Sequence, residues 1–164
     1  MNTTKKSTRK DNSNILLALM FIIIIILLVY IIFFTGGNGK TEFYSETLKF
    51  QNTVSSYLGK AQADTFGAYE TRNIIIGYNE EGTEIKNLDD TVLTPIANKD
   101  TVIEKDSKKY YKLNEENIEK LLEINVPVFT GIDWYICEDG SLGVKFTGGK
   151  PKWWSDNFED LKLS

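Results

Sequence analysis

The chain has 164 residues, a formal net charge of −4, no histidine and a single cysteine, Cys137. One cysteine cannot form a disulfide within the chain or a thiolate cluster for a metal, and without histidine it lacks the usual base that activates a cysteine nucleophile. Residues 35–164 carry 15 basic and 22 acidic side chains, a net charge of −7 with no dense basic patch. This balance excludes a nucleic-acid-binding protein.

Residues 1–14 are polar, lack aromatic side chains and show no periodicity, which predicts a disordered tail. Residues 15–34 form an uninterrupted run of 20 apolar residues. As a helix this run would measure about 30 Å, the thickness of the hydrocarbon core of a bilayer, and no face of it is polar. It therefore predicts a transmembrane helix.

The charges around the apolar run predict how it inserts. Four basic side chains precede it: Lys5, Lys6, Arg9 and Lys10. The positive-inside bias then predicts a cytoplasmic tail and a single-pass signal anchor in the cell membrane, with the C-terminal domain extracellular. A cleaved signal peptide is the alternative, since Thr35 and Gly37 have a spacing that a signal peptidase accepts.

The segments after the apolar run predict a linker and one domain. Residues 35–40 are rich in glycine, which weakens helices, and predict a flexible linker. Residues 41–164 are then long enough for one extracytoplasmic domain with a core of its own.

An amphipathic helix is predicted over residues 42–62. Its apolar side chains recur at helical spacing on one face: Phe43, Phe50, Val54, Tyr57, Leu58 and Ala61. Packing on the domain's own sheet would account for this face. Alternatively, the helix extends the membrane helix into a longer rod that contacts partners, which makes Phe43, Phe50, Val54 and Tyr57 candidate interaction residues.

The next stretch is less regular. Arg72–Ile76 predicts a short helix that Thr71 caps and Gly77 ends, although its three isoleucines would also suit a buried strand. Residues 78–100 are polar and rich in turn formers, which predicts a short helix or an irregular loop. Adjacent acids in this stretch could bind a cation or act as an acid–base pair, but a solvated loop is the simpler interpretation.

The C-terminal half predicts the sheet. Residues 101–113 alternate loosely and predict two short strands, and residues 115–124 predict a helix. Residues 132–137 and 142–147 flank a four-residue connection containing Asp-Gly, which predicts a hairpin. The expected fold class is α+β, with one N-terminal transmembrane helix followed by a small extracytoplasmic domain in which an amphipathic helix packs on a short antiparallel sheet.

Trp153 and Trp154 are the last candidate interaction residues. Neighbouring side chains on a regular element point in different directions, so one of the two is expected to be partly exposed. Beside Lys150 and Lys152 it could contact lipid head groups, a glycan or a protein. Covering the edge of the core is the alternative role.

The order of these parts resembles that of type IV pilins and pseudopilins. The stretch YYKLNEENIEKLLEI followed by WYICEDGSLGVKF is similar to small pilin-like proteins of Gram-positive bacteria, although the prepilin cleavage motif is absent. The resemblance implies that apolar N-terminal helices pack together in a filament or a secretion complex.

We therefore expect a non-enzymatic single-pass membrane protein that acts as a structural or interaction component of a bacterial cell-envelope assembly, possessing a pilin-like layout. Its expected partners are the lipid bilayer and other envelope proteins or further copies of itself. A membrane-anchored module that binds an extracellular ligand or glycan is the alternative, and a hydrolase using paired carboxylates is a third. No catalytic, cofactor-binding or metal-binding residue is assigned, and no cofactor is expected.

Overall fold

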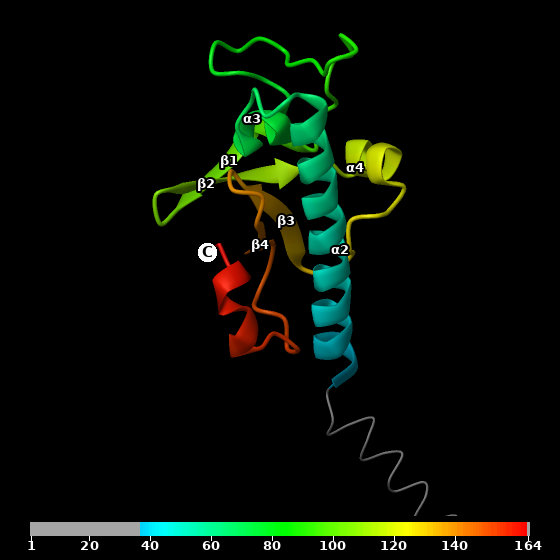
Figure 1. Cartoon of the computed structure of the whole chain (residues 1–164). Helices are drawn as coiled ribbons and strands as arrows, with labels where there is room; N and C mark the ends of the chain where they lie inside the picture. The colour runs from blue at the N-terminus through cyan, green and yellow to red at the C-terminus, as the bar shows by residue number, and fades with distance from the viewer. Residues whose placement is uncertain (1–36, 164) are drawn as a thin grey trace, which may run out of the picture. The chain divides into compact units, whose positions relative to one another are not determined.

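The computed structural model describes residues 37–163 (Figure 1). This part of the chain is α+β and contains a four-stranded antiparallel sheet. Its elements, in chain order, are α2 (Gly37–Asp64), α3 (Thr71–Ile76), β1 (Ala97–Lys105), β2 (Lys108–Leu113), α4 (Glu115–Leu122), β3 (Ile132–Cys137), β4 (Leu142–Phe146) and the 3₁₀ helix η1 (Asp156–Leu161).

The structure corrects the membrane part of the predicted fold. Among residues 37–163, no helix combines the length and the apolar character needed to cross a bilayer. α2 has the length, 28 residues, but it carries charged side chains such as Glu42, Lys49 and Lys60, which are costly at the centre of a membrane. The predictions of a transmembrane helix, a single-pass signal anchor and a place in the cell membrane are therefore not supported. The predicted tail, residues 1–14, and span, residues 15–34, lie outside the described residues.

The predicted linker is also corrected where it is described. α2 begins at Gly37, so residues 37–40 are helical rather than a flexible connector. A glycine in a helix costs only about 0.5–1 kcal/mol relative to alanine, and adding residues to a helix that already exists avoids the cost of nucleation. The packed turns that follow in α2 supply that nucleus.

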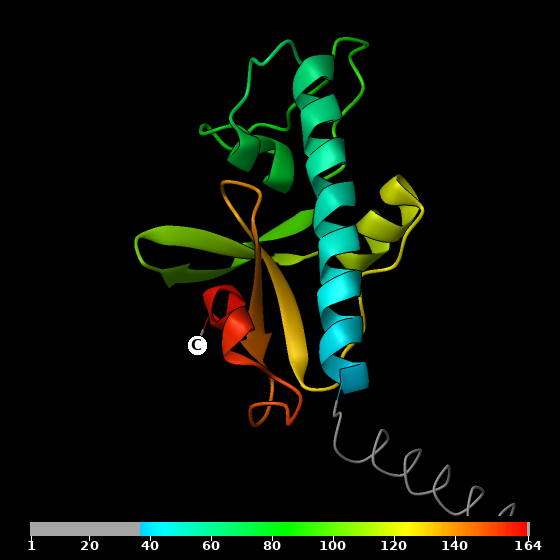
Figure 2. The same ribbon diagram turned by 60° about the horizontal axis from the view of Figure 1, so that its bottom comes forward.

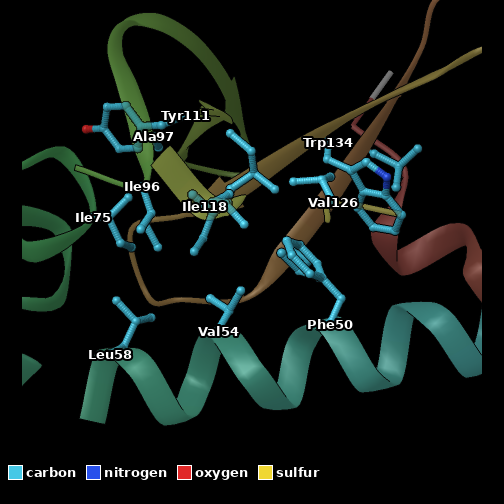
Figure 3. Packing of buried hydrophobic residues seen from close by; sticks show 14 of the residues in the cluster. Phe50, Val54, Leu58, Ile75, Ile96, Ala97, Tyr111, Ile118, Val126 and Trp134 are labelled. Carbon is cyan, nitrogen blue, oxygen red and sulfur yellow. The ribbon is translucent and has the colours of Figure 1, made fainter. Parts of the chain in front are cut away.

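The apolar stripe of α2 is buried, as expected for a helix that packs on its own domain. Phe43, Phe50, Val54, Leu58 and Ala61 all belong to one hydrophobic core. Figure 3 shows Phe50, Val54 and Leu58 projecting from α2 toward the strands and the loops between them. The 3.6-residue period of the sequence therefore marks the face that the sheet covers.

The sheet is a simple meander in the order β1-β2-β3-β4, and Figure 2 shows α2 running alongside it. β1 and β2 are joined by Asp106 and Ser107, both at positive φ (52° and 64°), the conformation of the two-residue turn that matches the twist of a hairpin. The predicted hairpin of β3 and β4 is confirmed, with Ile136 opposite Leu142. The free edge of β4 is covered near its middle, because the Leu163 N–H donates to the Val144 carbonyl at 2.8 Å.

Residues 77–93 contain no helix, which leaves the loop that was the other expectation for this stretch, whereas residues 97–100 belong to β1. Residues 77–93 form two consecutive loops of one design. In each loop an asparagine Oδ1 accepts a hydrogen bond from the backbone N–H four residues later: Asn79 from Thr83 at 2.8 Å, and Asn87 from Thr91 at 2.9 Å. These side-chain bonds replace the partners that a strand or helix would have supplied.

The two loops stack on each other through the backbone. The Ile85 N–H donates to the Gly77 carbonyl at 3.1 Å, and the Leu93 N–H donates to the Ile85 carbonyl at 2.9 Å. A third bond, from the Leu88 N–H to the Asp64 carbonyl at 3.1 Å, ties the second loop to the C-terminal end of α2. The loops are thus held against the C-terminal end of α2.

Candidate functional site: a groove beside the long helix

Most of the predicted interaction residues lie in the core. Phe43 and Val54 have no exposed surface, Phe50 is 2% exposed and Trp154 is 7% exposed. Trp153 is partly buried and packs against the same core. Burial on this scale leaves these side chains little surface to offer to a partner.

Phe43 is the centre of an aromatic cluster that joins four distant parts of the chain. Its ring lies near Trp134 of β3 in a stacked arrangement, with the ring centroids 5.7 Å apart. Four further rings surround it, with centroid distances between 4.8 and 5.4 Å: Phe129, Trp153, Trp154 and Phe158. Edge and offset contacts at these distances add to the energy of burial.

Both buried indole N–H groups have partners. Trp134 Nε1 donates to the Pro127 carbonyl at 2.7 Å, and Trp154 Nε1 donates to a Glu159 carboxylate oxygen at 3.1 Å. Neither polar group is left to bind a ligand, and Trp154 closes the core, which was its alternative role. The tryptophan pair therefore does not form an open platform for a glycan.

Tyr57, one of the predicted interaction residues, lines a groove beside α2. The groove has a volume of about 490 Å³ and lies between α2, residues 87–94 and α4. Its walls include the exposed apolar side chains Val92 and Leu121. Its apolar lining also includes Ala61, Leu93 and Leu122.

The chemistry of the groove suits binding. The Tyr57 hydroxyl donates to the Thr94 carbonyl at 3.4 Å, and burial raises the pKa of Tyr57, so the phenol stays neutral. The charged groups in the lining are Lys60 and Asp64, which oppose each other in sign, and the remaining polar groups are hydroxyl and amide side chains of Thr53, Ser56, Asn87, Thr91 and Thr94. The lining thus combines five apolar side chains with hydrogen-bonding and charged groups, so a ligand could make both kinds of contact there.

The strongest electrostatic shift lies elsewhere, at the turn between β3 and β4. Asp139 accepts hydrogen bonds from Lys108 Nζ at 2.8 Å and from the backbone N–H and hydroxyl of Ser141 at 3.0 and 2.6 Å. Partial burial of the Asp139 carboxylate opposes its ionisation, but these bonds outweigh that effect and hold its pKa well below the ordinary value. Ser141 belongs to the turn and Lys108 to the neighbouring β2, so these bonds hold the turn together and tie it to the sheet.

Cys137 lies beside this turn and is fully buried. Burial raises the pKa of its thiol, which keeps it protonated and unreactive at neutral pH. Within the described part of the chain, no group of three or more cysteine, aspartate or glutamate side chains is arranged to hold a metal ion.

The sequence did not identify the walls of the groove as a site. Leu121 and Leu122 belong to the segment that was predicted as a helix, and Val92 and Leu93 belong to the stretch that was predicted as a short helix or an irregular loop. The only signal in the sequence was that the short helix α4 has more apolar side chains than it can bury. In the structure, Ile118 is the one residue of α4 that is buried.

Comparisons with known proteins add no relative. No protein-family model matches the chain, and no curated protein or solved structure is significantly similar to it.

We expect Phe43→Ala to lower the free energy of unfolding of the full chain by about 3–5 kcal/mol, because the cavity would open at the centre of the aromatic cluster. Chemical denaturation followed by tryptophan fluorescence measures the change. Tyr44→Ala is the matched control: Tyr44 is the next residue of α2 but is 60% exposed, so its loss should cost no more than about 0.5 kcal/mol. Equal effects of the two substitutions would contradict the buried position of Phe43.

Asp139→Asn should make the stability of the chain less dependent on pH in acid. Because folding lowers the pKa of Asp139, the ionised carboxylate stabilises the folded state above its ordinary pKa of roughly 4, and this contribution is lost as the pH falls through the lower folded-state pKa. Urea denaturation at a series of pH values should show the variant less stable than the unaltered chain at neutral pH, with the difference shrinking from about pH 4 to about pH 2. Asp156→Asn, at a carboxylate that is 97% exposed, is the control and should change little. A deficit for Asp139→Asn that stays constant down to about pH 2 would contradict this account.

Proposed function

We propose that residues 37–163 form a non-enzymatic protein-interaction module, and that its groove binds a segment of a partner polypeptide. The observation that carries this proposal is the groove of about 490 Å³ with the exposed side chains Val92 and Leu121 on its walls. Exposed apolar side chains that meet at a concave surface are typical of binding sites.

The position of the groove supports a protein partner. Its lining comes from three elements that are each held in place: α2 by the core, residues 87–94 by the stacked loops and their bond to α2, and α4 by its buried Ile118. A site on such a scaffold needs little rearrangement on binding, which reduces its entropic cost. The groove is open along the flank of α2, so a chain can lie in it without threading through the domain.

The arrangement of titratable groups supports a binding role over a catalytic one. The most shifted carboxylate, Asp139, lies in the β3–β4 turn and its partners there are structural. Asp64 and Lys60, the charged groups that line the groove, come from one helix and differ in sign. An acid–base pair for hydrolysis would instead need two carboxyl groups facing one substrate.

The expectation that the chain acts as a component of a larger assembly fits this proposal. The resemblance to type IV pilins and pseudopilins stays a prediction. The alternative of glycan recognition through Trp153 and Trp154 loses support from their position in the aromatic cluster, so we propose only the protein partner.

Photo-crosslinking of the full chain in the cells that produce it tests this proposal. A benzophenone amino acid replaces Leu121 in the groove or, as a matched control, Val128, which is 91% exposed and does not line the groove. We expect position 121 to crosslink to a defined protein that position 128 does not capture, and Val92→Glu to abolish that product without changing the melting temperature. Identical products at both positions, or none at position 121, would contradict the proposal.

A further inference from the structure

The negative charge of the domain is concentrated at one end. Residues 62–91 contain seven acidic and two basic side chains, whereas the rest of residues 37–163 contains 15 acidic and 13 basic ones. This end comprises the last residues of α2, α3 and the two stacked loops. α2 adds to the negative potential there, because the C-terminal end of a helix carries partial negative charge and the last turn of α2 has no basic residue.

Most of this charge is not neutralised within the described residues. Among the acids of residues 62–91, only Asp90 makes an ion pair there, with Lys86 at 2.8 Å, and both side chains are largely exposed. An exposed pair of this kind contributes little to stability. The acidic end is therefore a surface of negative potential rather than a network that holds the fold together.

Exposed apolar side chains lie at the same end. Phe66 is 82% exposed and Leu88 is 55% exposed. Leu88 is brought to the end of α2 by the hydrogen bond from its N–H to the Asp64 carbonyl, and Phe66 follows Asp64 by two residues. Asp64 also lines the groove, so the groove opens onto this end of the domain.

The backbone conformation of Phe66 indicates that this residue does not contribute to the stability of the fold. Phe66 has φ of 53°, in the left-handed region that favours glycine or asparagine. A phenylalanine at this position costs backbone energy, and its exposed ring recovers little of it by burial. Aromatic side chains, phenylalanine included, are however enriched at interfaces relative to the rest of a protein surface.

We infer that the partner segment is cationic and apolar, and that it extends from the groove over the end of α2 to contact Phe66 and Leu88. This inference rests on the proposed function and specifies its partner. Charge complementarity carries it: the acidic surface attracts lysine and arginine side chains, while Phe66 and Leu88 offer apolar contacts between them. A second copy of this chain would bring the same negative charge to the surface and is disfavoured.

Titration of the full chain into a short fluorescent peptide of alternating lysine and leucine tests the inference by fluorescence anisotropy. We expect binding that weakens as the ionic strength rises from about 0.05 M to about 0.5 M, and no binding of a glutamate–leucine peptide. A lysine–serine peptide should bind more weakly, because it lacks apolar side chains. Equal binding of the lysine–serine or glutamate–leucine peptide would overturn the inference.

Two pairs of variants locate the binding. Phe66→Asn should weaken binding about fivefold or more while leaving the melting temperature unchanged or higher, because asparagine tolerates the left-handed backbone. Val128→Asn, at a similarly exposed apolar residue, is its control. For the charge contribution, the affinity of Asp89→Asn for the peptide is compared with that of Asp156→Asn.

The outcomes separate this inference from the proposed function. If Leu121→Ser weakens binding but Phe66→Asn and Asp89→Asn do not, the cationic contact is wrong and the groove stands. If none of the three substitutions weakens binding, both the inference and the proposed function are wrong.

Discussion

The packing of Phe43 and the stripe behind it on α2 is the contact on which the rest of the domain depends. The stripe extends from Phe43 to Ala61 and belongs to the same hydrophobic core as buried residues of α3, the strands and the C-terminal η1. At the Phe43 end the aromatic rings of β3, the preceding loop and the C-terminal segment meet around one side chain. At the other end Leu58 and Ala61 belong to the same core as the isoleucines of α3. The face of β3 that carries Trp134 and Ile136 belongs to this core, while Tyr135 and Cys137, on the opposite face, are buried as well.

The same contact decides where a partner can bind. Because the apolar face of α2 is used by its own domain, the helix is not free to act as a docking rod along that face. The flank of α2 is still available for binding. There Tyr57, the second stacked loop and α4 line a groove. The proposed binding site thus lies beside the core rather than in it, where substitutions can alter binding without a large cost in stability.

The sequence predicted the elements whose signals are local. Asn114 caps α4 through a hydrogen bond from the Asn117 N–H at 3.1 Å, and Gly77 ends α3 in a left-handed conformation. The stacked loops were missed because their period of eight matches neither a helix nor a strand, although Asn79 and Asn87 repeat at that interval. The groove could not be predicted, since whether Leu121 packs inward or lines a cleft depends on how far α4 stands from α2, a tertiary property.

Native-state hydrogen exchange of the full chain tests most directly the claim that α2 is part of the domain core. If it is, the amides of α2 from Phe50 to Ala61 should exchange only through the same global opening as those of β2 and β3, with equal free energies of opening. The slowest amides would then fall in all three elements together. An α2 whose amides exchange much faster than those of β2 and β3 would contradict the account, because it would show a helix that opens independently of the sheet.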